Sequence, residues 1–252
     1  MSVALETRGL SLAIGGAELV TDVSLVVQTG EILGVIGPNG AGKTTLFNLL
    51  TGVLAPTAGT VLLGGRDVTR ASVPARARAG LGRTFQTSNL FPTLTVQENV
   101  ALALQAHDRG SLSLLRRPRR DGATAERIHD HLCAVGLAGR AATTAGAMAH
   151  GEQRKLEIAL LLATDPSVVL LDEPMAGVGT GDVEELTALI GRIARDQQRT
   201  VLLVEHHMDV VLGLADRLAV LHHGHLLACD TPAAVMADDT VQHAYLGRRG
   251  AA

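Results

Sequence analysis

A glycine-rich segment near the amino terminus has the residue types and the spacing of a phosphate-binding loop. Residues 37–44 read Gly-Pro-Asn-Gly-Ala-Gly-Lys-Thr and match G-x-x-x-x-G-K-[S/T] at every fixed position. Glycines let the backbone approach a triphosphate closely, so that its N–H groups and the following helix N-terminus point at the anion. We expect Lys43 to reach the β- and γ-phosphates and the Thr44 hydroxyl to bind Mg²⁺. The expected nucleotide-binding residues of this loop are Gly37, Pro38, Asn39, Gly40, Ala41, Gly42, Lys43, Thr44 and Thr45.

Two adjacent carboxylates end an apolar segment much later in the chain. Val168–Leu171 is followed directly by Asp172 and Glu173. Because buried strands avoid charge, two acids at a strand tip indicate a cation or a reaction, rather than solvated acids alone. We expect Asp172 to bind Mg²⁺ through water, and Glu173 to act as the general base for an attacking water. Side chains alternate along a strand, so neighbouring acids can have different tasks.

Short apolar segments that alternate with helical patterns are the elements that must position these residues. The periodicity predicts strands over Glu31–Ile36, Val168–Asp172, Thr200–Val204 and Arg217–Leu221, and helices over Lys43–Leu50 and Val183–Asp196. This alternation predicts an α/β core with a mostly parallel, doubly wound sheet. The strand-like and helical segments around the glycine-rich loop also disfavour the alternative that it is an ordinary turn.

Two other regions have different patterns. The first ~30 residues and Thr60–Leu63 resemble antiparallel strands, with Gly64-Gly65 as a turn. From about Thr95 to Ala163 the pattern is helical, which predicts a helical subdomain inserted into the core. We therefore expect one domain over residues 1–252, with a core of about 1–94 and 165–252 and a helical subdomain of about 95–164.

Two shorter signals complete this description. Thr231-Pro232 predicts the start of a helix, with Thr as the cap and Pro in the first turn. Asp108–Gly122 is expected to be a connector, and its run Arg116-Arg117-Pro118-Arg119-Arg120 fits a solvated basic loop better than a contact with anionic lipid.

Composition excludes several classes of function. The chain has 22 basic and 25 acidic residues, a balance that argues against nucleic acid as a partner. Cys133 and Cys229 form neither a metal-ligand spacing nor a disulfide framework, which fits a reducing cytosol. The amino terminus lacks a secretory pattern, and no apolar run approaches the ~18 residues of a membrane helix. We expect a cytosolic chain that only a partner would hold at a membrane.

The order and spacing of the motifs resemble the ABC ATPase family over nearly the whole chain. Arg83-Thr84-Phe85-Gln86 is similar to the family's Q-loop, which implies that Gln86 contacts Mg²⁺ and the γ-phosphate. His206 follows a predicted strand at the place of the family's switch histidine and is implied to bind the γ-phosphate. Residues 148–154 take the place of the Leu-Ser-Gly-Gly-Gln signature, which closes over ATP held by the other subunit. The implied signature residues are Ala149, His150, Gly151, Glu152 and Gln153, and the implied catalytic residues are Lys43, Glu173 and His206.

Within that family, Gly82–Gln86, Leu94–Val100 and Leu156–Ala159 look most like ATPase subunits of branched-chain amino-acid importers. The resemblance implies ATP and Mg²⁺ as cofactors, and a second ABC ATPase subunit, identical or different, as a partner. It also implies integral membrane permease subunits, indirectly an extracytoplasmic substrate-binding protein, and a peripheral place on the cytoplasmic face of the inner membrane. An envelope-lipid exporter of the lipopolysaccharide type and an amide or urea importer are alternatives. A soluble ABC protein acting on ribosomes or DNA is disfavoured, because the chain has one set of motifs and no heptad run.

Four departures from the family pattern carry expectations of their own. Ala149 stands where a serine normally binds the γ-phosphate, so we expect a weaker composite ATP site there. Ile14 stands where an aromatic ring often stacks on adenine, which predicts loose discrimination between ATP and GTP. Glu152 replaces a glutamine and is expected to be harmless in a first helical turn. Gly177–Thr180 lacks a polar residue common in relatives, which puts communication between subunits through that loop in doubt.

Leu90, Phe91 and Leu94 follow the Q-loop and are a candidate surface for coupling to a membrane subunit. The alternative, that they are buried between the core and the helical subdomain, stays open.

Overall fold

The computed structural model of the chain describes residues 2–84, 90–109 and 122–246. Gln86 and the basic run 116–120, for which the sequence carries predictions, lie outside these residues. None of the described helices is both long enough and apolar enough to span a membrane. The strands are β1 (Val3–Ile14), β2 (Ala17–Gln28), β3 (Ile32–Ile36), β4 (Ala58–Leu63), β5 (Arg66–Asp67), β6 (Leu81–Arg83), β7 (Val168–Asp172), β8 (Thr200–Val204), β9 (Arg217–His222) and β10 (His225–Asp230).

The described helices alternate with these strands, except in the middle of the chain. They are α1 (Lys43–Thr51), α2 (Val73–Arg78), α3 (Val96–Arg109), α4 (Gly122–Ala134), α5 (His150–Leu162), α6 (Thr180–Arg195), α7 (Met208–Leu214), α8 (Pro232–Ala237) and α9 (Asp239–Leu246), with two short 3₁₀ turns, η2 (Ala138–Arg140) and η3 (Ala145–Ala147). The predicted start of α8 is confirmed, since the Thr231 hydroxyl oxygen accepts a hydrogen bond from the Ala234 N–H at 3.4 Å.

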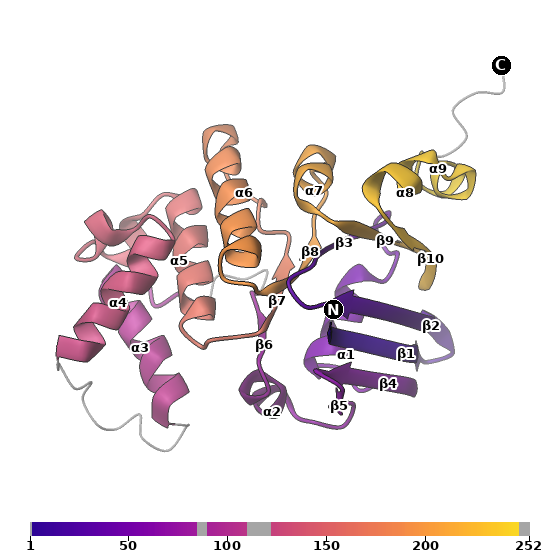
Figure 1. Ribbon diagram of the computed structural model, residues 1–252, viewed down its shortest axis with the longest axis horizontal. Coiled ribbons are helices and arrows are strands. Elements are labelled where there is room, and N and C mark those ends of the chain that lie inside the picture. The colour runs from indigo at the N-terminus through magenta and orange to yellow at the C-terminus, as the bar shows by residue number, and fades with distance from the viewer. Residues whose placement is uncertain (1, 85–89, 110–121, 247–252) are drawn as a thin grey trace. The chain divides into compact units, whose positions relative to one another are not determined.

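The strands of the described residues form two sheets (Figure 1). The first sheet is antiparallel in the order β2-β1-β4-β5, and the turn at Gly64-Gly65 joins β4 to β5. The second has the order β10-β9-β3-β8-β7-β6, in which all neighbours are parallel except β10 and β9. Both predictions, a mostly parallel sheet and antiparallel strands at the amino terminus, are therefore confirmed, whereas the strand β10 beside β9 was not predicted.

The main hydrophobic core joins the two sheets and encloses α1. Four side chains of α1, Leu46, Phe47, Leu49 and Leu50, have no exposed surface. They belong to one buried cluster with apolar side chains of both sheets, including Leu10, Val23, Leu33, Leu170 and Leu202. Burying a side chain of this kind stabilises a fold by roughly 1.5–3 kcal/mol. The helix that follows the glycine-rich loop is thus held firmly within the core.

The order of the parallel strands brings the candidate catalytic residues to one edge. β3, β8 and β7 are neighbours, and their carboxyl ends point the same way because they are parallel. The glycine-rich loop follows β3, Asp172 and Glu173 end β7, and His206 follows β8. In open α/β sheets this edge is where ligands bind.

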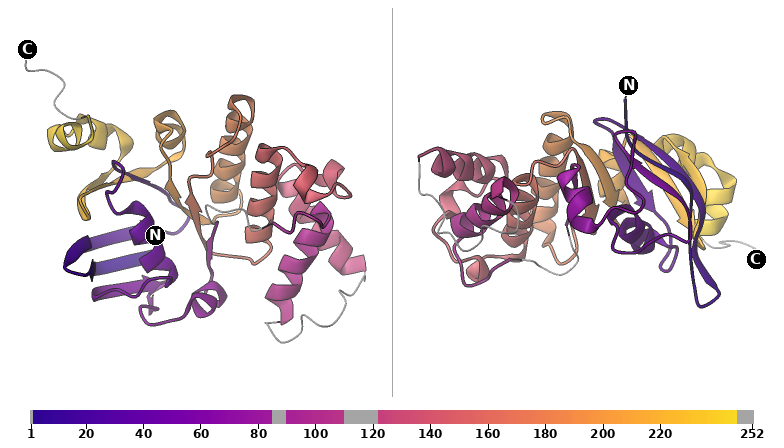
Figure 2. Two further views of the ribbon diagram at one scale, coloured as in Figure 1. Left: turned by 180° about the vertical axis from the view of Figure 1, so that it is seen from behind. Right: turned by 90° about the horizontal axis from the view of Figure 1, so that it is seen from below.

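The described residues divide into two compact units. The core unit is Met1–Arg83, Ser167–Glu173 and Gly191–Ala252, and it contains every strand that the structure describes. The helical unit is Thr84–Pro166 and Pro174–Ile190, and in it α3, α4 and α5 pack against one another (Figure 2). Its described residues form no strand, as predicted, apart from an isolated bridge between Thr95 and Thr144.

The helical unit is larger than the predicted 95–164. Residues 90–94 belong to it, since the Phe91 N–H donates to the Asn99 side-chain oxygen at 2.9 Å. Pro174–Ile190 also belongs to it, since the Lys155 ammonium pairs with Glu185 at 2.6 Å. Apolar periodicity alone could not reveal these polar contacts between distant segments.

Candidate functional site

The glycine-rich loop adopts a conformation that only glycine can fill at two positions. A Cβ on Gly37 would lie 2.2 Å from the Leu221 carbonyl oxygen, because β9 runs directly beside the loop. Gly42 has φ +102°, and a Cβ there would lie 2.8 Å from the Leu19 carbonyl oxygen. The loop is therefore packed against the backbone of two strands, and it ends where α1 begins at Lys43.

The Lys43 side chain points back toward this loop. Its ammonium donates to the carbonyl oxygens of Gly37 at 2.7 Å and Pro38 at 3.0 Å. Burial lowers the pKa of the Lys43 ammonium below its usual value, and the negative charges of Glu173 and Asp172 act in the opposite direction. The cation is thus held at the end of the loop where a phosphate would meet both the ammonium and the N-terminus of α1.

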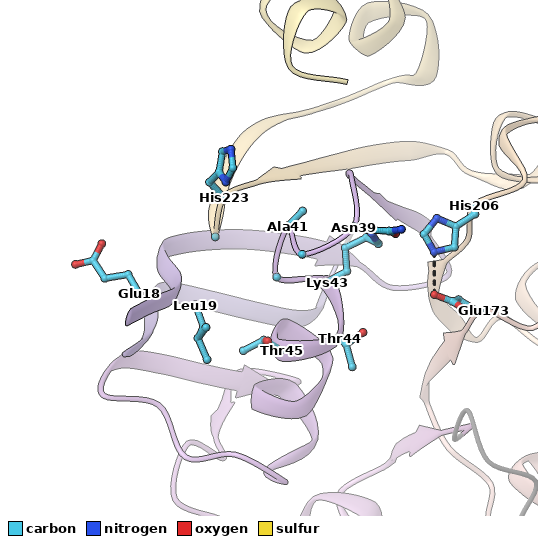
Figure 3. A pocket seen from close by; sticks show the side chains of 13 residues that line it. Glu18, Leu19, Asn39, Ala41, Lys43, Thr44, Thr45, Glu173, His206 and His223 are labelled. Atoms are coloured by element: carbon cyan, nitrogen blue, oxygen red, sulfur yellow. Dashed lines mark hydrogen bonds and ion pairs between the residues drawn. The ribbon is translucent and has the colours of Figure 1, made fainter. Parts of the chain in front are cut away.

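A cavity of about 400 Å³ lies along the loop (Figure 3). Its walls are Glu18, Leu19, Asn39, Gly40, Ala41, Gly42, Lys43, Thr44, Thr45, Glu173, His206, His223 and Gly224. In the view of Figure 3, Glu18, Leu19 and His223 lie on one side of the loop, and Glu173 and His206 lie on the other. The volume is in the range of small-molecule sites, and one end of the cavity carries an acid and an imidazole.

The two adjacent acids have different surroundings, as predicted from their alternation at the strand end. Asp172 has no exposed surface and is the last residue of β7. Its carboxylate pairs with the Arg83 guanidinium at 2.7 Å. Glu173 instead lines the cavity, and its side chain is 29% exposed. The Asp172 carboxylate is therefore buried in the core, while the Glu173 carboxylate can contact a ligand and water.

Glu173 and His206 contact each other in the cavity wall. The His206 Nε2 lies 2.9 Å from the Glu173 Oε1, a distance at which an Nε2–H donates to an ionised carboxylate. Glu173 has φ +49°, in the left-handed region, and its N–H donates to the Val204 carbonyl oxygen at 2.9 Å. Such a conformation costs of order 1–3 kcal/mol in a non-glycine residue and is typical of functional sites. A carboxylate and an imidazole so placed can accept and donate protons to one bound molecule.

The predicted signature residues lie at the start of α5 in the helical unit. Ala149 is the residue before the helix, and no side-chain hydrogen bond caps the helix there. Glu152 is in the first turn, accepts from the Ala149 N–H at 3.3 Å, and pairs with Arg140 at 2.8 Å. The Gln153 amide donates to the Ala145 carbonyl oxygen at 3.1 Å. Gly151 is buried, whereas His150 is exposed. The expectation that this motif starts a helix is confirmed.

Comparison with known proteins decides the family. A model of the ABC transporter family matches residues 20–176. The high-affinity branched-chain amino acid transport ATP-binding protein LivG of Escherichia coli is 40% identical over 250 residues, which are 96% of this chain and 97% of that protein. The chain belongs to the ABC transporter family. It is an ATP-binding subunit of that family, whose members hydrolyse ATP to drive transport.

Other relatives and solved structures agree with this assignment. The branched-chain amino acid transport ATP-binding protein BraF of Pseudomonas aeruginosa is 39% identical over 96% of this chain and 97% of that protein. The lipopolysaccharide export system ATP-binding protein LptB of Escherichia coli is 36% identical over the same shares. The ADP conformation of an ABC transporter cassette superposes with a TM-score of 0.86 at 27% identity, covering 98% of this chain and 100% of that one. The ABC ATPase fold predicted from the motifs is thereby confirmed.

Only some of the residues predicted to bind adenine or the metal ion line the cavity. Ile14, at the end of β1, is 54% exposed and is not among the residues that line the cavity, where Leu19 and Glu18 of β2 take part instead. The contact between Ile14 and adenine therefore stays a prediction. Gln86 lies outside the described residues. Thr44 lines the cavity at the first turn of α1 (Figure 3).

Sequence reasoning missed two side chains that contact the candidate site residues, Glu205 beside His206 and Arg83 beside Asp172. The buried Glu205 carboxylate accepts from the His206 N–H at 3.0 Å and lies 3.2 Å from the His207 Nδ1. Arg83 was noted only as part of the Q-loop motif, although it pairs with Asp172. A charge at the end of an apolar segment was the available signal for Glu205. No sequence signal connects Arg83 with an acid 89 positions away.

Proposed function

We propose that the chain is the ATP-hydrolysing subunit of an importer for branched-chain amino acids. Support for the substrate class comes from LivG and BraF, which are about two fifths identical over nearly the whole chain. LptB is somewhat less similar at 36% identity, so an envelope-lipid exporter is the second candidate. The observation that carries the ATPase chemistry is that Lys43, Glu173 and His206 line one cavity beside the phosphate loop.

Binding of ATP rests on the loop and on the start of α1. The triphosphate lies along the backbone of residues 37–45, where N–H groups and the helix N-terminus stabilise negative charge. Lys43 moves its ammonium from the carbonyl oxygens of Gly37 and Pro38 to the β- and γ-phosphates. The stabilisation is strong because the ammonium is buried, where charges interact through a low dielectric.

Hydrolysis rests on the pair at the other end of the cavity. Glu173 orients a water molecule and accepts its proton as the water oxygen attacks the γ-phosphorus. The bond from this phosphorus to the β–γ bridging oxygen breaks, and ADP leaves with that oxygen. His206 donates its Nε2–H to a γ-phosphate oxygen and so stabilises the charge that develops there. Their contact at 2.9 Å shows that both groups reach the same point in space. A water molecule and the γ-phosphate would take the place of this direct contact.

Thr44 and Asp172 are the proposed protein residues of a Mg²⁺ site, and Gln86 is the third expected one. Bound Mg²⁺ neutralises charge on the β- and γ-phosphate oxygens. Mg²⁺ usually takes one or two carboxylates, the substrate phosphates and water, rather than a cage of protein ligands. One hydroxyl and one carboxylate fit that preference. Within the described ranges no three His, Cys, Asp or Glu side chains form a cluster that could hold a metal ion.

The proposed working state is a dimer of two ABC ATPase subunits on the cytoplasmic face of the inner membrane. In it the start of α5, with Ala149 and Gly151, closes over ATP bound to the partner subunit, because a helix N-terminus favours an anion. Closure would move integral permease subunits, and hydrolysis would reset them. An extracytoplasmic substrate-binding protein would deliver the amino acid. We propose no nucleic-acid partner, since the chain has a formal net charge of −3.

Purification of the tagged chain from native membranes in mild detergent, with mass spectrometry of co-eluting proteins, tests this assembly. Two different polytopic permeases and a second, similar ATPase are the expected result. ATPase activity of that complex in proteoliposomes should rise when a binding protein loaded with leucine, isoleucine or valine is added. One kind of membrane partner linked to envelope lipids would establish the exporter instead. Ribosomal or chromosomal proteins without a permease would contradict transport altogether.

A further inference from the structure

A buried ion pair lies directly beneath the catalytic edge of the parallel sheet. Arg83 is the last residue of β6, and β6 runs parallel to β7, which ends in Asp172. The Arg83 Nη2 lies 2.7 Å from the Asp172 Oδ2, and the two side chains are 7% and 0% exposed. A guanidinium and a carboxylate at this distance form a charge-assisted hydrogen bond, which is stronger than a neutral one and has a fixed direction.

Two residues of α1 hold the same guanidinium from another side. The Arg83 Nη1 donates to the Asn48 side-chain oxygen at 2.6 Å. The Arg83 guanidinium carbon also lies 5.7 Å from the centre of the Phe47 ring, within the range of a cation–π contact. Arg83 therefore links α1, the helix that begins at Lys43 and carries Thr44, to the strand end that carries Asp172.

The contacts of Arg83 also fix the orientation of the Asp172 carboxylate. A carboxylate that rotates freely is a poor partner for Mg²⁺, because this cation requires its oxygen ligands in a well-defined geometry. The guanidinium supplies the opposite charge, and it occupies Oδ2 in a direction that Asn48 fixes. Ligands of metal ions are commonly oriented in this way by side chains that do not themselves touch the metal.

Another buried arginine shows what a purely structural role looks like. Arg76 is 1% exposed and is also bound to α1. Its hydrogen bonds all go to backbone carbonyl oxygens, those of Leu49, Leu50, Thr69 and Ala71. Arg76 thus satisfies the carboxyl end of α1, where cations are favoured, and it is not bonded to any residue of the catalytic edge in these contacts.

We propose that Arg83 is a positioning residue for the Mg²⁺ that accompanies ATP: it orients the Asp172 carboxylate and links it to the helix that carries Thr44. The inference rests on the proposed Mg²⁺ site at Thr44 and Asp172. Arg83 itself is not among the residues that line the cavity. Its effect is therefore on the part of ATP affinity that depends on Mg²⁺.

The test is ATP binding, measured by calorimetry on the full chain with excess Mg²⁺ and again with EDTA. A Glu173→Gln background prevents turnover during the measurement. In Arg83→Lys the charge remains, but an ammonium lacks the planar fork that spans Asn48 and Asp172. We expect the gain in affinity due to Mg²⁺ to fall about 10-fold, the lower end of the range for residues behind a metal ligand, with affinity in EDTA unchanged.

Two more variants distinguish the proposed positioning role from a general loss of stability. Asn48→Ala leaves the ion pair in place and removes only its orientation, so a smaller loss of the Mg²⁺-dependent gain is expected even if Arg83→Lys fails to fold. Arg76→Lys is the matched control, because it makes the same change in another buried arginine on α1. Arg76→Lys should lower thermal stability without changing the Mg²⁺-dependent gain.

The outcomes separate the two proposals. An unchanged or larger Mg²⁺-dependent gain in Arg83→Lys and in Asn48→Ala would overturn the positioning role and leave the Mg²⁺ site standing. Equal losses of the gain in Arg83→Lys and Arg76→Lys would also overturn it, since the effect would then reflect general destabilisation. If the Glu173→Gln chain itself binds ATP equally with Mg²⁺ and with EDTA, the proposed metal site is wrong as well.

Discussion

At the scale of single residues, two adjacent histidines that follow β8 have different partners. His206 Nε2 faces Glu173 at 2.9 Å and lines the cavity. His207 Nδ1 lies 3.2 Å from the buried Glu205 and is not among the cavity-lining residues. The same side chain at neighbouring positions therefore faces the cavity in one case and a buried carboxylate in the other.

This difference predicts the results of two alanine substitutions. His206→Ala should lower kcat of the assembled complex by ~10²–10³, because it removes a donor to the developing charge on the γ-phosphate. His207→Ala should lower it only a few-fold, since Glu205 keeps its hydrogen bond from the His206 N–H. Steady-state ATPase assays of both variants, with KM for ATP, check this. Equal loss in the two variants would mean that the segment after β8 acts only as a structural unit.

Residue types at fixed spacing were enough to predict much of this site. The phosphate loop was predictable because Gly37 and Gly42 lie against backbone atoms that leave no room for a Cβ, and Lys43 needs a fixed distance from them. The different surroundings of Asp172 and Glu173 were expected from alternation at a strand end. The pairing of Arg83 with Asp172 was not predictable, because it arises from the sheet order that makes β6 the neighbour of β7.

At the scale of elements, α5 is a helix whose first residues are expected to meet the partner's ATP. Its preceding residue is Ala149, which offers no side-chain oxygen to the orphan N–H groups of the first turn. Glu152 compensates in part, because its carboxylate accepts from the Ala149 N–H at 3.3 Å. The helix is thus stabilised from its third position rather than from its cap.

Ala149→Ser should therefore have two separate effects. In the isolated chain a serine cap should stabilise the protein by about 0.5–2 kcal/mol, visible in urea unfolding. In the assembled complex the added hydroxyl should raise ATPase activity, because a hydrogen bond to a charged phosphate contributes about 1.5–3 kcal/mol. Ala147→Ser, at an exposed position just before α5, is the control and should change neither. A stability gain without a rise in activity would reject the idea that Ala149 weakens the composite site.

The elements themselves were predicted unevenly. Strands β3, β7, β8 and β9 were predictable to within one residue at each end, because buried parallel strands are short continuous apolar runs. The edge strands β5, β6 and β10 were not, since they are partly exposed or very short. The boundary of the helical unit was misplaced because Pro174–Ile190 is joined to it by polar contacts such as Arg154 to the Pro174 carbonyl oxygen at 3.0 Å.

At the scale of the whole molecule, the chain contains both halves of the proposed chemistry but on separate compact units. The core unit holds the phosphate loop, Glu173 and His206, and the helical unit holds the start of α5. A signature that acts on the partner's nucleotide requires a second subunit for each complete site. Activity of the assembled complex, rather than of the chain alone, is therefore the appropriate measure of function.

The central claim is that this chain hydrolyses ATP with Glu173 as the base, and Glu173→Gln tests it most directly. A glutamine has the same shape and can still contact His206, but it cannot accept a proton from water. ATPase activity of the assembled complex and ATP affinity are measured side by side for the native chain and the variant. We predict that turnover falls to the background level while ATP affinity stays within a few-fold of the native value. Retained turnover in Glu173→Gln would contradict the account and show that the base lies elsewhere.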